Sequence, residues 1–134
     1  ADWYRKNIFP NYERIFEPIK KSGKKIIFVS DGNYSELIDD IFTLGVDGIM
    51  IDNYVALEPV LKKYGENKVV VGNVDSRILT EGRKDDVYKE VKRCIDLGKK
   101  YPGYFLKASG DLPQNIPLEN IEYYFELCNE LGRR

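Results

Sequence analysis

Four aspartates follow four short apolar runs along the chain. They are Asp31, Asp52, Asp75 and Asp111, in the local sequences SDGN, DN, GNVDS and SGD. A carboxylate can act as acid or base, accept hydrogen bonds from substrate N–H groups, or bind a hard cation such as magnesium. Asp, Asn and Gly are also common in loops and helix caps, but four equivalent positions favour a polar edge that faces a ligand. No Asp-x-Asp ladder accompanies them, so we expect no metal.

The apolar runs before these aspartates have the length and composition of buried strands. Each is too short for a helix and is bounded by Gly, Asp or Asn. The predicted strands are 26–29 (IIFV), 48–51 (GIMI), 68–72 (KVVVG) and 104–108 (YFLKA).

Apolar residues at helical spacing fill the segments between and around these strands. A helix before the first strand has Tyr12, Ile15, Phe16 and Ile19 on its apolar face. Four later helices are predicted to begin at Asn33 (a capping box with Glu36), Pro59, Asp85 or Asp86, and Pro117, and to end at Gly45, Gly65, Gly98 and Gly132. Asp31-Gly32 therefore lies in a strand-to-helix loop, not in a hairpin.

The alternation of strands and helices predicts an α/β fold with a parallel sheet in the order 1-2-3-4 and right-handed crossovers. We expect a single domain over residues 1–134, with an entering helix in 1–24 and four βα units in 25–134. Ligands of parallel α/β folds bind at the carboxyl ends of the strands, which is where the four aspartates are predicted to lie.

Composition excludes several classes of function. With 21 basic and 22 acidic residues, the net charge of −1 does not favour nucleic-acid binding. The longest apolar runs fall far short of a membrane span of about 20 residues, and the N-terminus lacks a signal-peptide pattern. Cys94 and Cys128 lie far apart in helical patterns, which argues against a disulfide framework. We expect a cytoplasmic protein. The chain begins at Ala1, not Met, and we expect it to be part of a longer one.

The chain contains no histidine, which removes the usual general base and the commonest metal ligand. Both cysteines fall on apolar helical faces, where packing is the expected role. No phosphate-binding glycine loop is present. Arg77 follows the third strand, where it is either a solvated loop residue or a contact for an anionic substrate. These observations predict no cofactor.

From Lys25 onward the chain resembles the C-terminal half of the uroporphyrinogen decarboxylase superfamily. The resemblance rests on IIFVSDGN, LGVDGIMID, KVVVGNVDSRIL and KASGDLPQNIPLEN, which follow the family's order and spacing. It implies the C-terminal half, (βα)4, of a TIM (β/α)8 barrel. It also implies one of two chemistries: cofactor-free decarboxylation of tetrapyrrole acetate groups in porphyrin and haem biosynthesis, or methyl transfer between a corrinoid and a thiol by a zinc enzyme.

By position, the resemblance implies that seven residues line the pocket: Asp31, Gly32, Asn73, Asp75, Ser109, Gly110 and Asp111. Catalytic residues are not assigned, because the family's principal aspartate and arginines lie in the N-terminal half. The zinc ligands of the methyltransferases are replaced here by Val29-Ser30-Asp31-Gly32 and by a residue near Gly110. The decarboxylases have a histidine near Gly110, and it is also absent.

Three functions follow from the resemblance and its departures. The first is a decarboxylase-like protein that binds a tetrapyrrole. The second is a corrinoid-dependent methyltransferase relative without zinc ligands, and the third is a non-catalytic fragment that associates to complete a barrel. We expect this chain alone to be inactive, and to form a homodimer or pair with an N-terminal half.

We predict that the protein binds no stoichiometric zinc, since histidine is absent and Asp31 and Gly110 occupy the family's thiol positions. Elemental analysis of protein purified without chelators measures this. Zinc bound through Cys94 or Cys128 at one ion per chain would contradict the prediction.

Overall fold

The computed structural model describes residues 1–133, and its centre is a sheet of four parallel strands. The strands are β1 (Ile27–Val29), β2 (Gly48–Met50), β3 (Val69–Val71) and β4 (Tyr104–Phe105). Their order is β1-β2-β3-β4 and every pairing is parallel. The predicted order and direction are confirmed.

The fourth strand is shorter than predicted. After Phe105 the ladder with β3 breaks, and it returns only as a single bridge between Val74 and Ala108. The break lies opposite Gly72, whose φ of 139° takes the β3 backbone out of the extended conformation.

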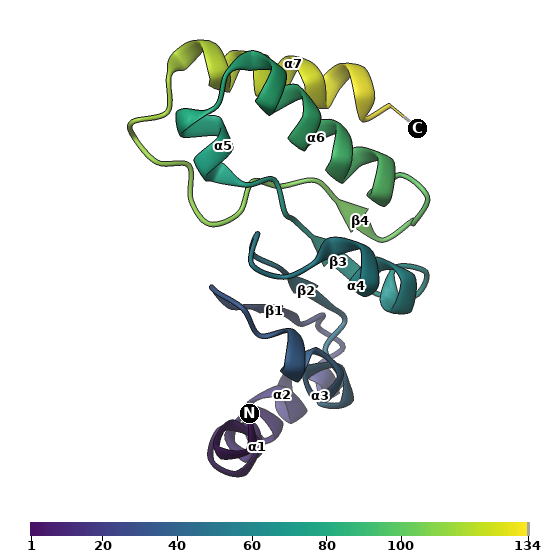
Figure 1. Cartoon of the computed structure of the whole chain (residues 1–134). Helices are drawn as coiled ribbons and strands as arrows, with labels where there is room; N and C mark the ends of the chain where they lie inside the picture. The colour runs from purple at the N-terminus through teal and green to yellow at the C-terminus, as the bar shows by residue number, and fades with distance from the viewer. Residues whose placement is uncertain (134) are drawn as a thin grey trace.

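Helices cover one face of this sheet and flank both of its edges (Figure 1). Before β1 come α1 (Asp2–Asn7) and α2 (Phe9–Lys21), and the later elements are the 3₁₀ helix η1 (Ser35–Leu37), α3 (Ile38–Thr43), α4 (Leu57–Tyr64), α5 (Ser76–Glu81), α6 (Lys84–Gly98) and α7 (Leu118–Leu131). In Figure 1, α2 lies beyond β1, and α7 lies at the opposite end, beyond β4. None of the helices in residues 1–133 is long and apolar enough to cross a membrane.

Several helix starts differ from the prediction. The Asn33 side chain accepts a hydrogen bond from the Ser35 N–H (3.1 Å) and opens η1, so α3 begins only at Ile38 and has no side-chain cap. The predicted capping box with Glu36 is therefore wrong. The next helix begins two residues before Pro59, which still lies in its first turn, where backbone N–H groups need no intrahelical acceptor.

The last two long helices begin close to their predicted positions. Lys84 opens α6, and the Asp86 carboxylate accepts a hydrogen bond from the Arg83 N–H (3.1 Å) at its N-terminus. Pro117 is the N-cap of α7. The short helix α5 was not predicted, because its six residues, SRILTE, contain too few turns to show an apolar period.

The register of the sheet separates two layers of side chains. Phe28, Ile49, Val70 and Tyr104 are neighbours across the four strands, face the helices and are at most 8% exposed. The alternate residues form the opposite side, here named the open face: Ile27, Val29, Met50, Val69, Val71 and Phe105. Val29 is 53% and Phe105 58% exposed. The core therefore lies between the sheet and the helices, and the described part of the chain leaves the other face uncovered.

Leu61 and Leu118 provide a matched test of where this core lies. Leu61 on α4 is 1% exposed, whereas Leu118 on α7 is 69% exposed. We predict that Leu61→Ala lowers the free energy of unfolding by about 2–5 kcal/mol, because it removes buried methyl groups and leaves a cavity. Leu118→Ala is expected to change it by less than about 0.5 kcal/mol. Urea unfolding followed by circular dichroism measures both, and equal losses would contradict this placement.

Candidate functional site at the carboxyl ends of the strands

All four aspartates lie in the loops that follow the carboxyl ends of the strands; these loops are here named the rim. Asp31, Asp52 and Gly110 line a shared notch beside Val29 and Met50 of the open face. The notch encloses about 10 Å³, which is close to the minimum for one water molecule. In this chain the rim is therefore one wall of a site rather than a closed pocket.

Asp52 is the most firmly positioned carboxylate in the notch. Its Oδ2 accepts a hydrogen bond from the Gly32 N–H (3.0 Å) and its Oδ1 accepts one from the Asn53 N–H (2.7 Å). Gly32 has a φ of 77°, a conformation that favours glycine, while nothing lies within 4 Å of the position a Cβ would take. Glycine is thus needed here for the backbone turn that joins the first two rim loops, not for space.

Unlike Asp52, Asp31 has a carboxylate that no hydrogen bond orients. Its side chain is exposed at the edge of the notch. Within residues 1–133 its carboxylate has no hydrogen-bond or ion-pair partner. An unpaired carboxylate beside an oriented one presents hydrogen-bond acceptors to any molecule that approaches the open face from the rim.

Tyr34 is hydrogen-bonded to the backbone of Met50, a residue that lines the notch. Its hydroxyl donates to the Met50 carbonyl (2.7 Å), and its ring meets Phe28 edge-on with centroids 5.9 Å apart. Burial, and secondarily the negative charge of Asp52, raise the pKa of Tyr34 well above its usual value. The hydroxyl therefore stays protonated and acts as a fixed donor.

Asp75 is used locally rather than in the notch. It caps α5 by accepting a hydrogen bond from the Arg77 N–H (3.0 Å), and it forms an ion pair with the Arg77 guanidinium (2.7 Å). This guanidinium lies 5.5 Å from the centre of the Tyr54 ring. The hydrogen bond from the Arg77 side chain is the main cause that lowers the pKa of Asp75. Asp75 and Arg77 line a separate surface hollow beside α5.

The remaining predicted residues divide between the interior and the surface. Asn73 and Ser109 are 2% and 3% exposed, and the Ser109 hydroxyl accepts from the Ser76 N–H at 3.4 Å. Gly110 lines the notch, whereas Asp111 is exposed and does not line it. The structure thus brings Asp31, Asp52 and Gly110 together and leaves Asp75 and Asp111 outside the group.

A buried polar network under the rim was missed from the sequence. The Asn73 amide donates to the carbonyls of Val55 (2.7 Å) and Asp52 (3.2 Å). Glu90 of α6 accepts from the Asp75 N–H (3.0 Å) and is paired with Arg93 (2.7 Å). These bonds tie the loops after β2 and β3 to α6. The available signal was Glu90 itself, a charge on the helical stripe that contains Val87, Val91 and Cys94.

The cysteines take packing positions on helices. Cys94 on α6 is fully buried, and burial raises the pKa of its thiol to about 12. Cys128 on α7 is half-buried, and burial again raises the thiol pKa. Both thiols are protonated at neutral pH, so neither is an activated nucleophile. Among residues 1–133, no three His, Cys, Asp or Glu side chains form a group that could hold a metal ion.

The substitution Asp75→Asn is predicted to remove the ion pair with Arg77 and to keep the cap of α5, since asparagine caps helices as well as aspartate. The folded-state pKa of Asp75 is lowered, so the ion pair adds stability above the unfolded-state pKa of about 3.9 and loses it as pH falls through the folded-state value. We expect the wild type to be more stable than Asp75→Asn at about pH 6. The difference between their free energies of unfolding should become smaller by about pH 2.5.

Urea unfolding at both pH values measures the gap, and Asp75→Ala is the control. It also removes the cap and should cost about 1 kcal/mol more than Asp75→Asn at either pH. A gap between wild type and Asp75→Asn that stays constant or widens in acid would show that the ion pair does not stabilise the fold.

Comparison with known proteins places this geometry in a family. Residues 1–131 match the family model of uroporphyrinogen decarboxylase (URO-D). The uroporphyrinogen decarboxylase of Carboxydothermus hydrogenoformans is 26% identical over 129 residues, which cover 96% of this chain and 36% of that protein. The enzyme of the same name from Geobacillus kaustophilus is 32% identical over 118 residues, covering 87% and 33%.

A solved structure shows the same arrangement of elements. A methyltransferase from Methanosarcina mazei superposes with a TM-score of 0.74 at 18% identity, covering 98% of this chain and 38% of that one. At this identity the likeness shows the fold alone. The chain spans less than two fifths of the length of these relatives. It belongs to the uroporphyrinogen decarboxylase family and has the fold of the C-terminal half, (βα)4, of a TIM (β/α)8 barrel.

Proposed function

We propose that this chain forms one wall of a uroporphyrinogen decarboxylase-like site that binds a tetrapyrrole. The proposal rests on one observation: the unpaired Asp31 carboxylate stands beside the oriented Asp52 carboxylate, directly above the apolar side chains of the open face. Both of the curated relatives described above are named uroporphyrinogen decarboxylase, which supports the same assignment.

The chemistry of a tetrapyrrole complements this arrangement. Its pyrrole N–H groups are hydrogen-bond donors, and carboxylates are acceptors with several lone-pair positions. Its apolar ring edges match Val29 and Met50, which line the notch. In this proposal Asp31 accepts from the pyrrole N–H groups, while Asp52 keeps a fixed orientation because the Gly32 and Asn53 N–H groups hold it.

Lys107 adds a contact for the acidic side chains of the substrate. Its ammonium donates to the carbonyls of Ala108 (3.0 Å) and Gly110 (2.6 Å) and has a third donor in addition. The two carbonyls fix the charge next to the notch, where it would offset the repulsion between the rim aspartates and substrate carboxylates.

The proposal assigns binding and orientation to this chain, not the full reaction. The notch alone encloses about 10 Å³, which is far too little for a macrocycle, so the substrate must also contact what faces the open side. Decarboxylation of the acetate side chains would then be completed by groups on that opposite wall. For this reason we expect the isolated chain to be inactive.

A methyltransferase function is the competing proposal. The Methanosarcina mazei structure shares the fold, but the rim here has Ser30, Asp31 and Gly110 and contains neither histidine nor cysteine. A zinc-thiolate mechanism needs those soft or imidazole ligands. The donor set of the rim consists of oxygen atoms, which favours the decarboxylase-like assignment.

An NMR titration of the ¹⁵N-labelled chain with uroporphyrinogen III, kept reduced under nitrogen, tests the proposal. We predict chemical-shift changes at the amides of Gly32, Asn53 and Gly110. Asp31→Asn should weaken binding by about 10- to 100-fold, since a hydrogen bond to a charged group contributes about 1.5–3 kcal/mol. Cobalamin serves as the corrinoid ligand for comparison.

Asp111→Asn is the matched control, because Asp111 is an exposed rim aspartate outside the notch. It should leave the affinity within about twofold. Tighter binding of cobalamin than of the tetrapyrrole, or an equal effect of the two asparagine variants, would reject the assignment.

A further inference from the structure

Arg77 places a guanidinium at the rim, and Asp75 uses only part of it. Its Nε donates to Asp75 Oδ1 (3.0 Å) and its Nη2 donates to Oδ2 (2.7 Å). A guanidinium has five N–H donors, so three remain, and two of these are parallel along the edge formed by Nη1 and Nη2. Within residues 1–133, Nη1 has no hydrogen-bond partner. The Arg77 side chain is 63% exposed, so this edge is open to a ligand.

Two contacts hold the guanidinium in a fixed place. It lies 5.5 Å from the centre of the Tyr54 ring, close enough for a cation–π interaction. Its partner Asp75 is anchored from below, because the Asp75 N–H donates to the buried Glu90 carboxylate (3.0 Å). The hydrogen bond to Asp75 raises the pKa of Arg77 further above its usual value, so the guanidinium stays charged. A charged donor that is already oriented loses little conformational entropy when it binds a ligand.

Arg77 and Tyr54 lie between loops that contribute to the notch. Tyr54 belongs to the loop after β2, and the same loop supplies Asp52 to the notch. On the other side, the N–H of Ser76 donates to the Ser109 hydroxyl (3.4 Å), which belongs to the loop after β4. A ligand that is larger than the notch would therefore meet Arg77 beside it.

The surrounding charges restrict the direction from which an anion can reach Arg77. Glu81 and Asp86 line the hollow beside α5 together with Arg77, and their carboxylates repel an anion on that side. The side toward Tyr54 and the notch carries no such barrier beyond the rim aspartates. Lys107, whose ammonium donates to the Gly110 carbonyl (2.6 Å), is a second cation next to the notch. Two cations at one site favour a ligand with more than one carboxylate.

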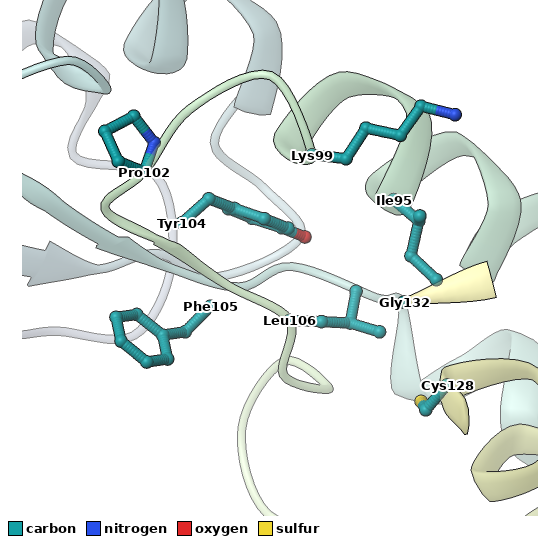
Figure 2. A pocket seen from close by; sticks show the side chains of 8 residues that line it. All are labelled: Ile95, Lys99, Pro102, Tyr104, Phe105, Leu106, Cys128 and Gly132. Carbon is teal, nitrogen blue, oxygen red and sulfur yellow. The ribbon is translucent and has the colours of Figure 1, made fainter. Parts of the chain in front are cut away.

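The cavity beside β4 has a different chemistry (Figure 2). It has a volume of about 380 Å³, and its lining consists mainly of apolar side chains from β4, α6 and α7 together with Lys99. The Lys99 ammonium is already paired with Asp96 (3.0 Å). Lys99 and Pro102 precede β4, so the cavity extends toward the amino-terminal end of this strand, away from the rim. The charged contact for a ligand of the notch is therefore Arg77.

We infer that Arg77, held against Tyr54 by Asp75, binds a carboxylate group of the ligand that occupies the notch. The two parallel N–H groups on its open edge match the two oxygens of a carboxylate in a bidentate arrangement. The ligand class is then a molecule with several carboxylates rather than a neutral one. For a tetrapyrrole these groups are the acetate and propionate side chains, and in this respect the inference rests on the proposed function.

Titration with a small dicarboxylate tests the site without a tetrapyrrole. The ¹⁵N-labelled chain is titrated with glutarate and, separately, with glutaramide, its neutral diamide, while sodium chloride keeps the ionic strength constant. We expect glutarate to shift the Arg77 Nε–H signal and the amide signals of Tyr54 and Ser76, and glutaramide to leave them unchanged. Arg77→Gln should abolish the amide shifts. Arg14→Gln is the matched control, because it removes an exposed arginine on α2, and it should retain them.

The same variants are then titrated with uroporphyrinogen III, kept reduced under nitrogen. Arg77→Gln should weaken binding by about tenfold, because a charge-assisted hydrogen bond to a substrate carboxylate is lost. Arg14→Gln makes the same change in net charge and should leave the affinity within about twofold. Circular dichroism checks that every variant is folded.

Three outcomes would overturn the inference: no response of Arg77 to glutarate, equal shifts with glutarate and glutaramide, or binding of uroporphyrinogen III that depends on Asp31 but is unchanged by Arg77→Gln. In the third case the proposed function would stand. If glutarate binds at Arg77 while uroporphyrinogen III does not bind the wild type, the carboxylate site stands and the proposed function fails.

Discussion

The alternation of side chains across four parallel strands in register is the constraint on which the rest of the structure depends. It directs Phe28, Ile49, Val70 and Tyr104 toward the helices, where they form a buried core. The same alternation must direct the residues before and after them to the other face. These are also apolar, because parallel strands are normally buried on both sides. A stable core on one face thus leaves an exposed apolar surface on the other.

The parallel direction of the strands also fixes where polar chemistry collects. All four carboxyl ends lie at one edge, so Asp31, Asp52 and Gly110 meet although they are far apart in sequence. Position alone does not make these carboxylates equivalent. Backbone N–H groups orient Asp52, Arg77 neutralises Asp75, and Asp31 remains unpaired. Buried Glu90, paired with the more exposed Arg93, holds the loop after β3 to α6 through the Asp75 N–H.

Strand order and direction were predictable because short apolar runs alternating with helical periods allow few other topologies. The placement of the aspartates at one end followed from the same pattern. Two local features were not predictable. The Asn33 side chain accepts from the Ser35 N–H at the start of a 3₁₀ helix instead of capping an α-helix, and α5 is too short to show an apolar period. The burial of Glu90 could not be predicted without knowing which face of α6 packs against the core. Ile15 and Phe125 lie on apolar stripes and yet are 54% and 52% exposed, which helical periodicity alone does not show.

In the proposed function, binding of a ligand at the notch is coupled to covering of the open face, because the substrate also contacts an opposite wall. The notch lies at the top of the open face, so a macrocycle placed there contacts this chain and the element that covers Val29 and Phe105. A ligand that touches both halves must strengthen their association by the same factor by which association strengthens its own binding. Each half alone then offers only part of the contacts, and affinity rises when the barrel closes. A binding site that is divided between two walls does not need an enclosed pocket in either wall alone, and the small notch at the rim agrees with this.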